Sequence, residues 1–84
     1  MTENEIIDRL KKFRQYEYAK IRKMIGALAY MVDMIRHYHE KEELSDIWVY
    51  ADMIEHRALM IKASVDLIDK LNEMLAKLEK GKGQ

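Results

Sequence analysis

The fold is decided by residues 44–78, which read LSDIWVYADMIEHRALMIKASVDLIDKLNEMLAKL. This stretch carries two apolar ribbons on one helix. The stronger ribbon advances in steps that alternate between four and three residues, a spacing that keeps side chains on one helical face. It consists of Ile47, Ala51, Ile54, Ala58, Ile61, Val65 and Ile68. We expect this ribbon to pack against another helix of the same chain.

The second ribbon lies on a different side of the same helix, roughly 160° from the first. A single neighbouring helix covers only one of two such ribbons. The second ribbon therefore predicts self-association, as a homodimer or a higher homo-oligomer. The predicted interface consists of Val49, Met53, Met60, Ala63, Leu67 and Met74.

Length and composition agree with an oligomer of small subunits. A domain of 84 residues buries only about 60–65% of its unfolded surface, so association enlarges the core. Lys and Arg number 15, as do Asp and Glu, which argues against binding to DNA or lipid through overall charge. The chain has no cysteine, which excludes disulfides and thiolate metal sites.

Nothing in the sequence suggests a membrane protein. The longest uncharged apolar run, residues 24–32, is far shorter than the roughly 20 residues that span a bilayer. The acidic start, with Glu3, Glu5 and Asp8, is unlike a secretion signal. We expect a cytoplasmic protein without membrane contact.

The first half of the chain predicts another long helix. Thr2 and Glu5 have the spacing of a capping box, in which the hydroxyl of the first residue accepts from the amide of the second. An apolar stripe follows at core spacing, but Arg14 and Glu17 interrupt it, and we expect them to form ion pairs, either within the helix or between subunits. The stripe consists of Ile7, Leu10, Ile21, Met24, Leu28, Met31, Ile35 and Tyr38.

A turn is predicted because the apolar phase breaks between the two halves. Continuing the first stripe beyond Tyr38 would place Glu42, Ser45 and Asp52 in the core, whereas the ribbon restarts out of register at Leu44. We expect Ser45 to cap the second helix. The predicted single domain, residues 1–84, has helices over about 3–39 and 45–80, a turn over 40–44 and a flexible tail over 81–84. The fold class is all-α: an antiparallel two-helix hairpin assembling into a four-helix bundle or larger helical oligomer.

An alternative function follows from a line of basic and aromatic residues on the first helix. Cationic side chains bind phosphates, and tyrosines stack on exposed bases. The line consists of Arg9, Lys12, Tyr16, Lys23 and Tyr30. The expected architecture resembles the small plasmid RNA-binding hairpins, which pair into four-helix bundles and bind RNA through their first helices. That resemblance implies a small RNA- or DNA-binding regulator.

Metal chemistry has two weaker indications. Asp33 and His37 stand one helical turn apart, as do Asp52 and His56. Such pairs can hold a metal between helices, but the Glu-x-x-His signature of bundle metal sites is missing from both helices. We assign no metal and no cofactor, and leave these pairs open.

The acidic turn raises a third possible function. Glu43 and Asp46 resemble the Glu-x-x-Asp half of the motif in MazG-type nucleotide pyrophosphohydrolases, in which carboxylates from two helices hold magnesium. The chain departs from that motif because its only Glu-x-x-Glu, formed by Glu40 and Glu43, overlaps the other half. Acids at a helix start are also favoured by the helix dipole.

The leading prediction is a non-enzymatic adaptor or regulator that acts through protein–protein interaction, with an unidentified protein partner. The sequence has no combination of Ser, His and acid typical of a hydrolase, no glycine-rich phosphate loop and no thiol nucleophile. Nucleic-acid binding is the alternative, and a MazG-like enzyme is the third reading.

Overall fold

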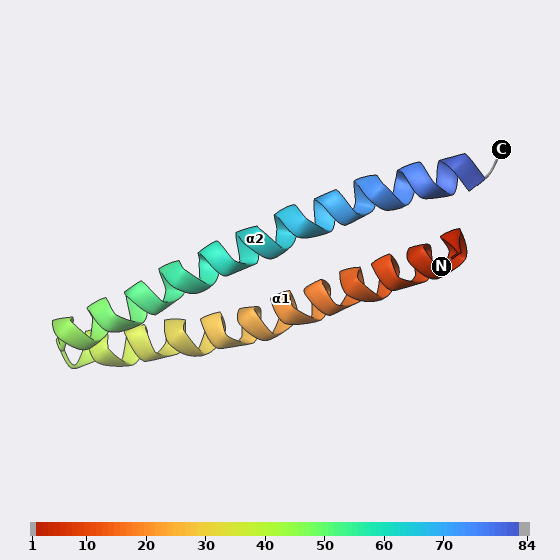
Figure 1. Cartoon of the computed structure of the whole chain (residues 1–84). Coiled ribbons are helices and arrows are strands. Elements are labelled where there is room, and N and C mark those ends of the chain that lie inside the picture. The colour runs from red at the N-terminus through yellow and green to blue at the C-terminus, as the bar shows by residue number, and fades with distance from the viewer. Residues whose placement is uncertain (1, 83–84) are drawn as a thin grey trace.

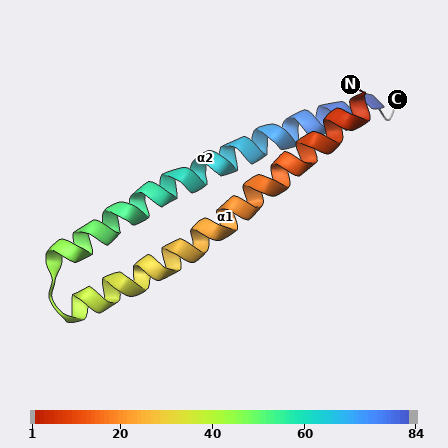
Figure 2. The same cartoon turned by 60° about the horizontal axis from the view of Figure 1, so that its bottom comes forward.

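The computed structural model describes residues 2–82, with side chains through residue 81. Two helices, α1 (Glu3–Glu40) and α2 (Leu44–Lys82), run antiparallel along a hairpin with extents of 63 × 17 × 14 Å (Figure 1; Figure 2). The predicted all-α hairpin is confirmed. Helix α2 continues through Gly81 and Lys82, which the sequence assigned to the flexible tail, while residues 83–84 lie outside the described part.

Helix α1 begins as its sequence predicts. The Thr2 hydroxyl accepts a hydrogen bond from the Glu5 amide at 3.2 Å, and Thr2 itself has extended backbone angles. This bond supplies a partner to one of the amides that the first turn of a helix leaves unpaired. Glu3 and Glu5 add negative charge where the helix dipole favours it.

The turn between the helices is short and closes with two backbone hydrogen bonds. The Glu43 amide donates to the Tyr38 carbonyl at 3.0 Å, and the Glu42 amide donates to the His39 carbonyl at 3.1 Å. This pattern is a Schellman motif, which requires a left-handed residue that is usually glycine. Here Glu42 occupies that position with φ 59°. Helix α2 then begins at Leu44, so Ser45 lies inside its first turn and the predicted Ser45 cap is wrong.

The face of α1 that packs on α2 follows a regular heptad, with steps of three and four residues. Ile7, Met24 and Met31 are buried along it. Glu17, which the sequence placed in the gap of the apolar stripe, is buried as well, with only 4% of its surface exposed. The two helices therefore meet along the predicted stripe of α1, including its polar interruption.

The corresponding face of α2 differs from the prediction. The isoleucines of the stronger ribbon do face α1, but Ala51, Ala58 and Val65 are exposed. The residues that pack beside the isoleucines are instead those three positions after each of them: Tyr50, Arg57, Ser64 and Leu71. The inner face of α2 consists of Ile47, Tyr50, Ile54, Arg57, Ile61, Ser64, Ile68, Leu71, Leu75 and Leu78, all buried or half-buried.

A signal for the correct face was present in the last third of the helix. Leu71, Leu75 and Leu78 continue from Ile68 in steps of three and four. The same three- and four-residue spacing, followed from Leu71 toward the N-terminus, passes through Ser64. The predicted ribbon, followed toward the C-terminus, would instead place the polar residues Asn72 and Glu79 on the inner face. Two polar residues in the central part of the inner face, Arg57 and Ser64, concealed this pattern.

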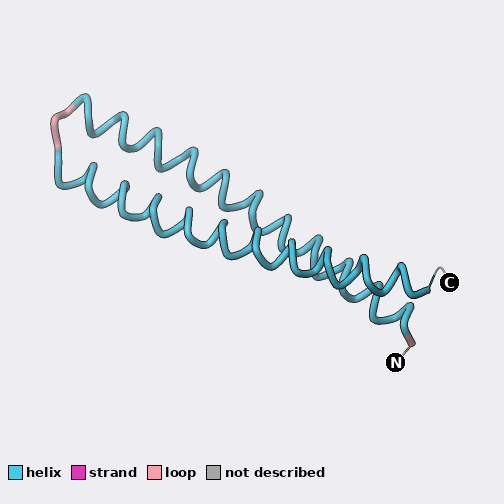
Figure 3. Tube along the Cα trace, turned by 90° about the horizontal axis from the view of Figure 1, so that it is seen from above, coloured by secondary structure: helices cyan, strands magenta, loops and turns pink. Residues whose placement is uncertain are grey.

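Figure 3 shows the short loop that joins the two helices at one end of the hairpin, and aromatic residues pack near this end. The rings of Tyr38 and Tyr50 stack with centroids 5.7 Å apart and an interplanar angle of 23°. Burial and the neighbouring Tyr30 and Tyr38 raise the pKa of Tyr50 above its ordinary 10.0. This contact places Tyr50 on the side of α2 that faces α1.

Candidate protein-interaction surface

The hairpin has two flanks, one on each side of the seam between its helices. In antiparallel helices with a common heptad, residues immediately beside the seam on one helix adjoin their counterparts on the other. On the first flank, the Lys11 ammonium lies 3.3 Å from a Glu79 carboxylate oxygen. On the same side, the Arg14 guanidinium donates to the Asn72 side-chain carbonyl at 2.8 Å. Polar contacts thus join the two helices across this flank.

The second flank is apolar along most of its length, and we call it the methionine face. Lys20 of α1 marks its position, because it lines one hollow together with Met60 and Leu67 of α2. Side chains at seven-residue intervals from these three belong to the same flank. The face consists of Phe13, Met34, Met53, Met60, Leu67 and Met74. Within residues 2–81 no ion pair joins the two helices across it.

Most of the predicted oligomer interface belongs to this face or borders it. Val49, Met53, Met60 and Met74 are exposed between 38% and 49%, Ala63 is exposed and Leu67 is half-buried. These side chains therefore remain partly exposed beside α1. Self-association through them stays a prediction, because the structure contains a single chain.

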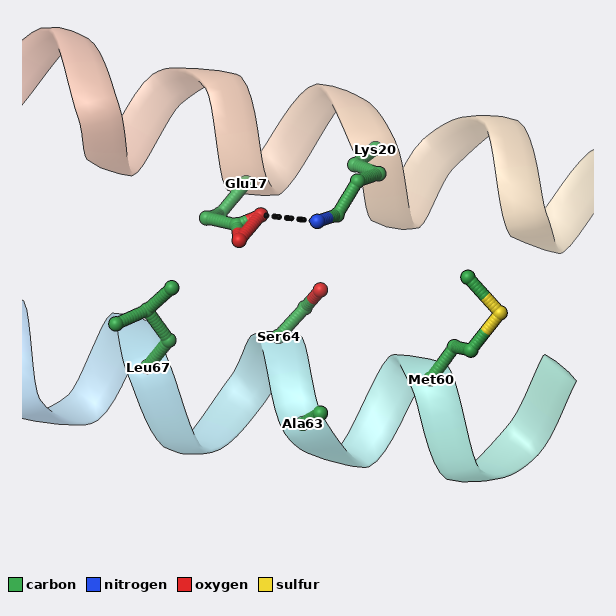
Figure 4. A pocket seen from close by; sticks show the side chains of 6 residues that line it. All are labelled: Glu17, Lys20, Met60, Ala63, Ser64 and Leu67. Carbon is green, nitrogen blue, oxygen red and sulfur yellow. Dashed lines mark ion pairs between the residues drawn. The ribbon is translucent and has the colours of Figure 1, made fainter. Parts of the chain in front are cut away.

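A hollow of about 200 Å³ opens on the methionine face near its middle (Figure 4). Its lining combines one ion pair with apolar and small side chains. Glu17 and Lys20 come from α1, and Figure 4 shows both directed toward α2. The α2 side is formed by Met60, Ala63, Ser64 and Leu67.

The Glu17 carboxylate in this hollow is incompletely paired. The Lys20 ammonium lies 3.1 Å from Glu17 Oε2, which satisfies the distance of an ion pair. The same oxygen is buried and receives no hydrogen bond, so the contact is electrostatic without the alignment that a hydrogen bond needs. A buried carboxylate with an unsatisfied oxygen is costly, since its lost hydration is only partly replaced.

Sequence reasoning found part of this arrangement. It identified Arg14 and Glu17 as polar residues at core positions and expected ion pairs. Glu17 does pair, with Lys20 one turn away, whereas Arg14 bonds the neutral Asn72. Lys20 and Ser64 were missed; Ser64 was hidden because the predicted face of α2 placed it off the seam.

The basic and aromatic line of α1 is exposed. Tyr16 and Tyr30 are 63% and 59% exposed, and Arg9, Lys12 and Lys23 are exposed too. Tyr16 and Lys23 line a hollow of about 130 Å³ with Ala19 and Lys20, and Lys20 Nζ lies 5.7 Å from the centre of the Tyr16 ring. Tyr30 is two heptads from Tyr16, about 21 Å along the helix. The line is a shallow surface rather than a cleft.

Metal-binding groups do not gather in the part of the chain that the structure describes. No three His, Asp or Glu side chains there lie close enough to hold one ion. Asp33 lies 3.9 Å from the Arg36 guanidinium. Neither described helix is long and apolar enough to cross a membrane.

Comparison with protein-family models, curated proteins and solved structures gave no match.

Proposed function

We propose that this protein is a non-enzymatic interaction module, an adaptor or regulator, that pairs with a second copy into a four-helix bundle across the methionine face. The observation that carries the proposal is the centre of the methionine face. Both flanks leave apolar side chains exposed, but within residues 2–81 no ion pair joins the helices across the methionine face, and its centre holds the hollow with the buried Glu17 carboxylate. Exposed apolar surfaces on small proteins commonly mark interaction sites.

The dimensions of the hairpin support a second copy as the occupant. One side of a body 63 Å long and 17 Å wide has an outline on the order of 1,000 Å², while a stable interface needs roughly 800 Å² from each partner. Two hairpins packed along their length would thus reach the size of a specific dimer. The larger shared core would also stabilise a chain of only 84 residues.

The spacing of the α2 residues also favours a symmetric dimer. Met53 and Met74 are equally distant from the midpoint between Ala63 and Ser64, and so are Met60 and Leu67. A two-fold axis through that midpoint would pack two antiparallel α2 helices with large side chains opposite large ones. Such self-complementarity is what an isologous interface requires.

Sedimentation of the purified protein at tens of micromolar tests the proposal directly. We expect a dimer for the wild type and a monomer for Met60→Glu, because the new carboxylate would lose its hydration in a hollow that then holds two acids against the single ammonium of Lys20. The matched control is Val65→Glu on the opposite flank, where the exposed fraction is similar, 44% against 38% for Met60. The control should remain dimeric. A monomeric wild type, or equal dissociation by both variants, would contradict the proposal.

A second candidate function is nucleic-acid binding by α1. The observation that favours it is the exposure of both Tyr16 and Lys23 within one hollow. Single-stranded RNA should then bind with an affinity that falls steeply with salt, by a slope of about 0.7 per phosphate contacted. Tyr16→Ala should weaken binding by roughly 1–3 kcal/mol without changing that slope. Tyr18→Ala, an exposed tyrosine on the other flank, is the control.

Titration of mixed single- and double-stranded oligonucleotides at low salt decides between the two candidates. Absence of any salt-sensitive binding would reduce the basic line to a solvated surface. It would leave the interaction module as the only proposal.

A further inference from the structure

The hollow on the methionine face lies at the point where a two-fold axis would pass. Its α2 residues are arranged symmetrically about the same midpoint as the longer ribbon: Met60 with Leu67, and Ala63 with Ser64. Two copies related by this axis would place their hollows against each other. Each hollow brings one carboxylate, from Glu17, and one ammonium, from Lys20.

We propose that Glu17 and Lys20 exchange partners across the dimer axis. Glu17 of each copy accepts a hydrogen bond from Lys20 of the other, so the two hollows close over a cluster of two acids and two bases. This inference rests on the proposed dimer and adds to it the residues that fix its register.

The state of Glu17 in the single chain is the first argument. The side chain is 95% buried, and its Oε2 atom has an ammonium nearby but no hydrogen bond. Lysine carries three donors, and within residues 2–81 Lys20 contacts one carboxylate, that of Glu17. A second ammonium, approaching through the open side of the hollow, would supply the missing donor.

The exposure of Lys20 is the second argument. Its side chain is 41% exposed, so water still solvates the ammonium at the mouth of the hollow. A second copy seated on the methionine face removes that water. The ammonium then needs a carboxylate from the new interface, because an ion pair in a dry environment is stable only when its remaining groups are bonded. The only acid that lines the hollow is Glu17.

The third argument is the cost of other registers. A shift of one heptad in the dimer would place Lys20 of one copy among the methionines of the other rather than near Glu17. An ammonium enclosed by apolar side chains is strongly disfavoured, so one polar position in an apolar interface can select a single alignment. The cluster would thus contribute specificity even where it adds little to affinity.

A charge-exchange experiment separates pairing between copies from pairing within one copy. Glu17→Lys has two cations in the hollow and Lys20→Glu has two anions, so each variant alone should be largely monomeric. Mixed together, they should form a heterodimer on the order of tenfold more stable than either homodimer, because each cation then meets an anion of the other copy. Native mass spectrometry after mixing measures the proportions.

The matched control uses the exposed pair Asp33 and Arg36, which has the same three-residue spacing on α1. Asp33→Lys and Arg36→Glu should leave each homodimer intact, and their mixture should give the statistical proportion of heterodimer. A similar preference in this control would overturn the assignment to the hollow, since it would reflect overall charge.

A conservative variant covers the case in which Glu17→Lys fails to fold. Glu17→Gln keeps the shape of the side chain and should weaken the dimer several-fold while making its dissociation less sensitive to salt. An unchanged dissociation constant and salt dependence would overturn the exchange. The same holds if the mixed charge variants pair statistically while the wild type is a dimer. A monomeric wild type would overturn the proposed function as well.

Discussion

The two flanks of this hairpin have the same heptad geometry but differ in how side chains connect the helices across them. On one flank, Lys11 with Glu79 and Arg14 with Asn72 connect the helices near their open end, and apolar residues such as Ile25 and Val32 lie exposed nearer the turn. On the methionine face, the apolar side chains extend past the midpoint, with one ion pair at the centre. The polar connections join the two helices of the hairpin, and within residues 2–81 no ion pair between the helices crosses the methionine face.

This difference shows why exposure alone does not identify an interface. Val65 and Met60 are similarly exposed on α2. Only Met60 borders a hollow that contains a buried, incompletely bonded carboxylate. Methionine is also unbranched and adaptable, which suits a surface that repacks on binding.

The largest effect is expected at the seam that both flanks share. Ile54→Glu places a charge between the helices and should lower the free energy of unfolding by several kcal/mol, which is enough to abolish the folded hairpin. Met60→Glu should retain its helical circular dichroism. Equal loss of helix in both variants would mean that the seam and the methionine face are not distinct surfaces.

Glu17→Met should raise the free energy of unfolding of the hairpin, which Ile54→Glu lowers. Replacing a buried, poorly bonded carboxylate by an apolar side chain of similar volume should stabilise the single hairpin by roughly 1–3 kcal/mol, because Lys20 stays partly exposed to water. The same change should weaken the dimer, as Glu17→Gln should, because Lys20 then has no carboxylate in the interface. Urea unfolding at a concentration where the protein is monomeric and sedimentation measure the two effects, and a destabilised hairpin with an unchanged dimer would contradict the expectation.

Asn72→Ala removes the hydrogen bond from Arg14 that joins the two helices on the flank opposite the methionine face. Loss of the bond to Arg14 should cost roughly 0.5–1.5 kcal/mol of unfolding free energy, because the guanidinium regains water when it is released. Dimerisation should not change, since the methionine face is untouched. An altered dissociation constant would show that the two flanks are coupled.

The smallest effect is expected at the turn, which belongs to neither flank. Glu42→Gly should stabilise the hairpin by roughly 0.5–1 kcal/mol, because a left-handed backbone is costly for glutamate and not for glycine. Glu40→Gly, in the last helical residue, is the control and should destabilise by about the same amount. A thermal melt of both variants distinguishes relief of strain from a general effect of glycine.

Much of this structure could be predicted from local sequence. The Thr2 cap, the heptad of α1 and the buried position of Glu17 follow from residue type and spacing, and these features need no knowledge of the partner helix. The turn could be located because the apolar phase changes between Tyr38 and Ile47. Its closing geometry could not, since the left-handed residue is a glutamate rather than the expected glycine.

The sequence by itself determined that two long amphipathic helices fold back on one another, because hydrophobic periodicity and a break in its phase are properties of the chain alone. Only the tertiary structure decided how α2 is rotated about its axis. The isoleucine column has Ala51, Ala58 and Val65 on one side and, on the other, a column that includes Tyr50, Ser64 and Leu71. Both satisfy a three–four spacing. The choice depends on contacts with α1, which the periodicity of α2 alone does not specify. In the folded hairpin the second column faces α1, with Tyr50 stacked on Tyr38, and that rotation leaves the methionines beside Glu17 and Lys20.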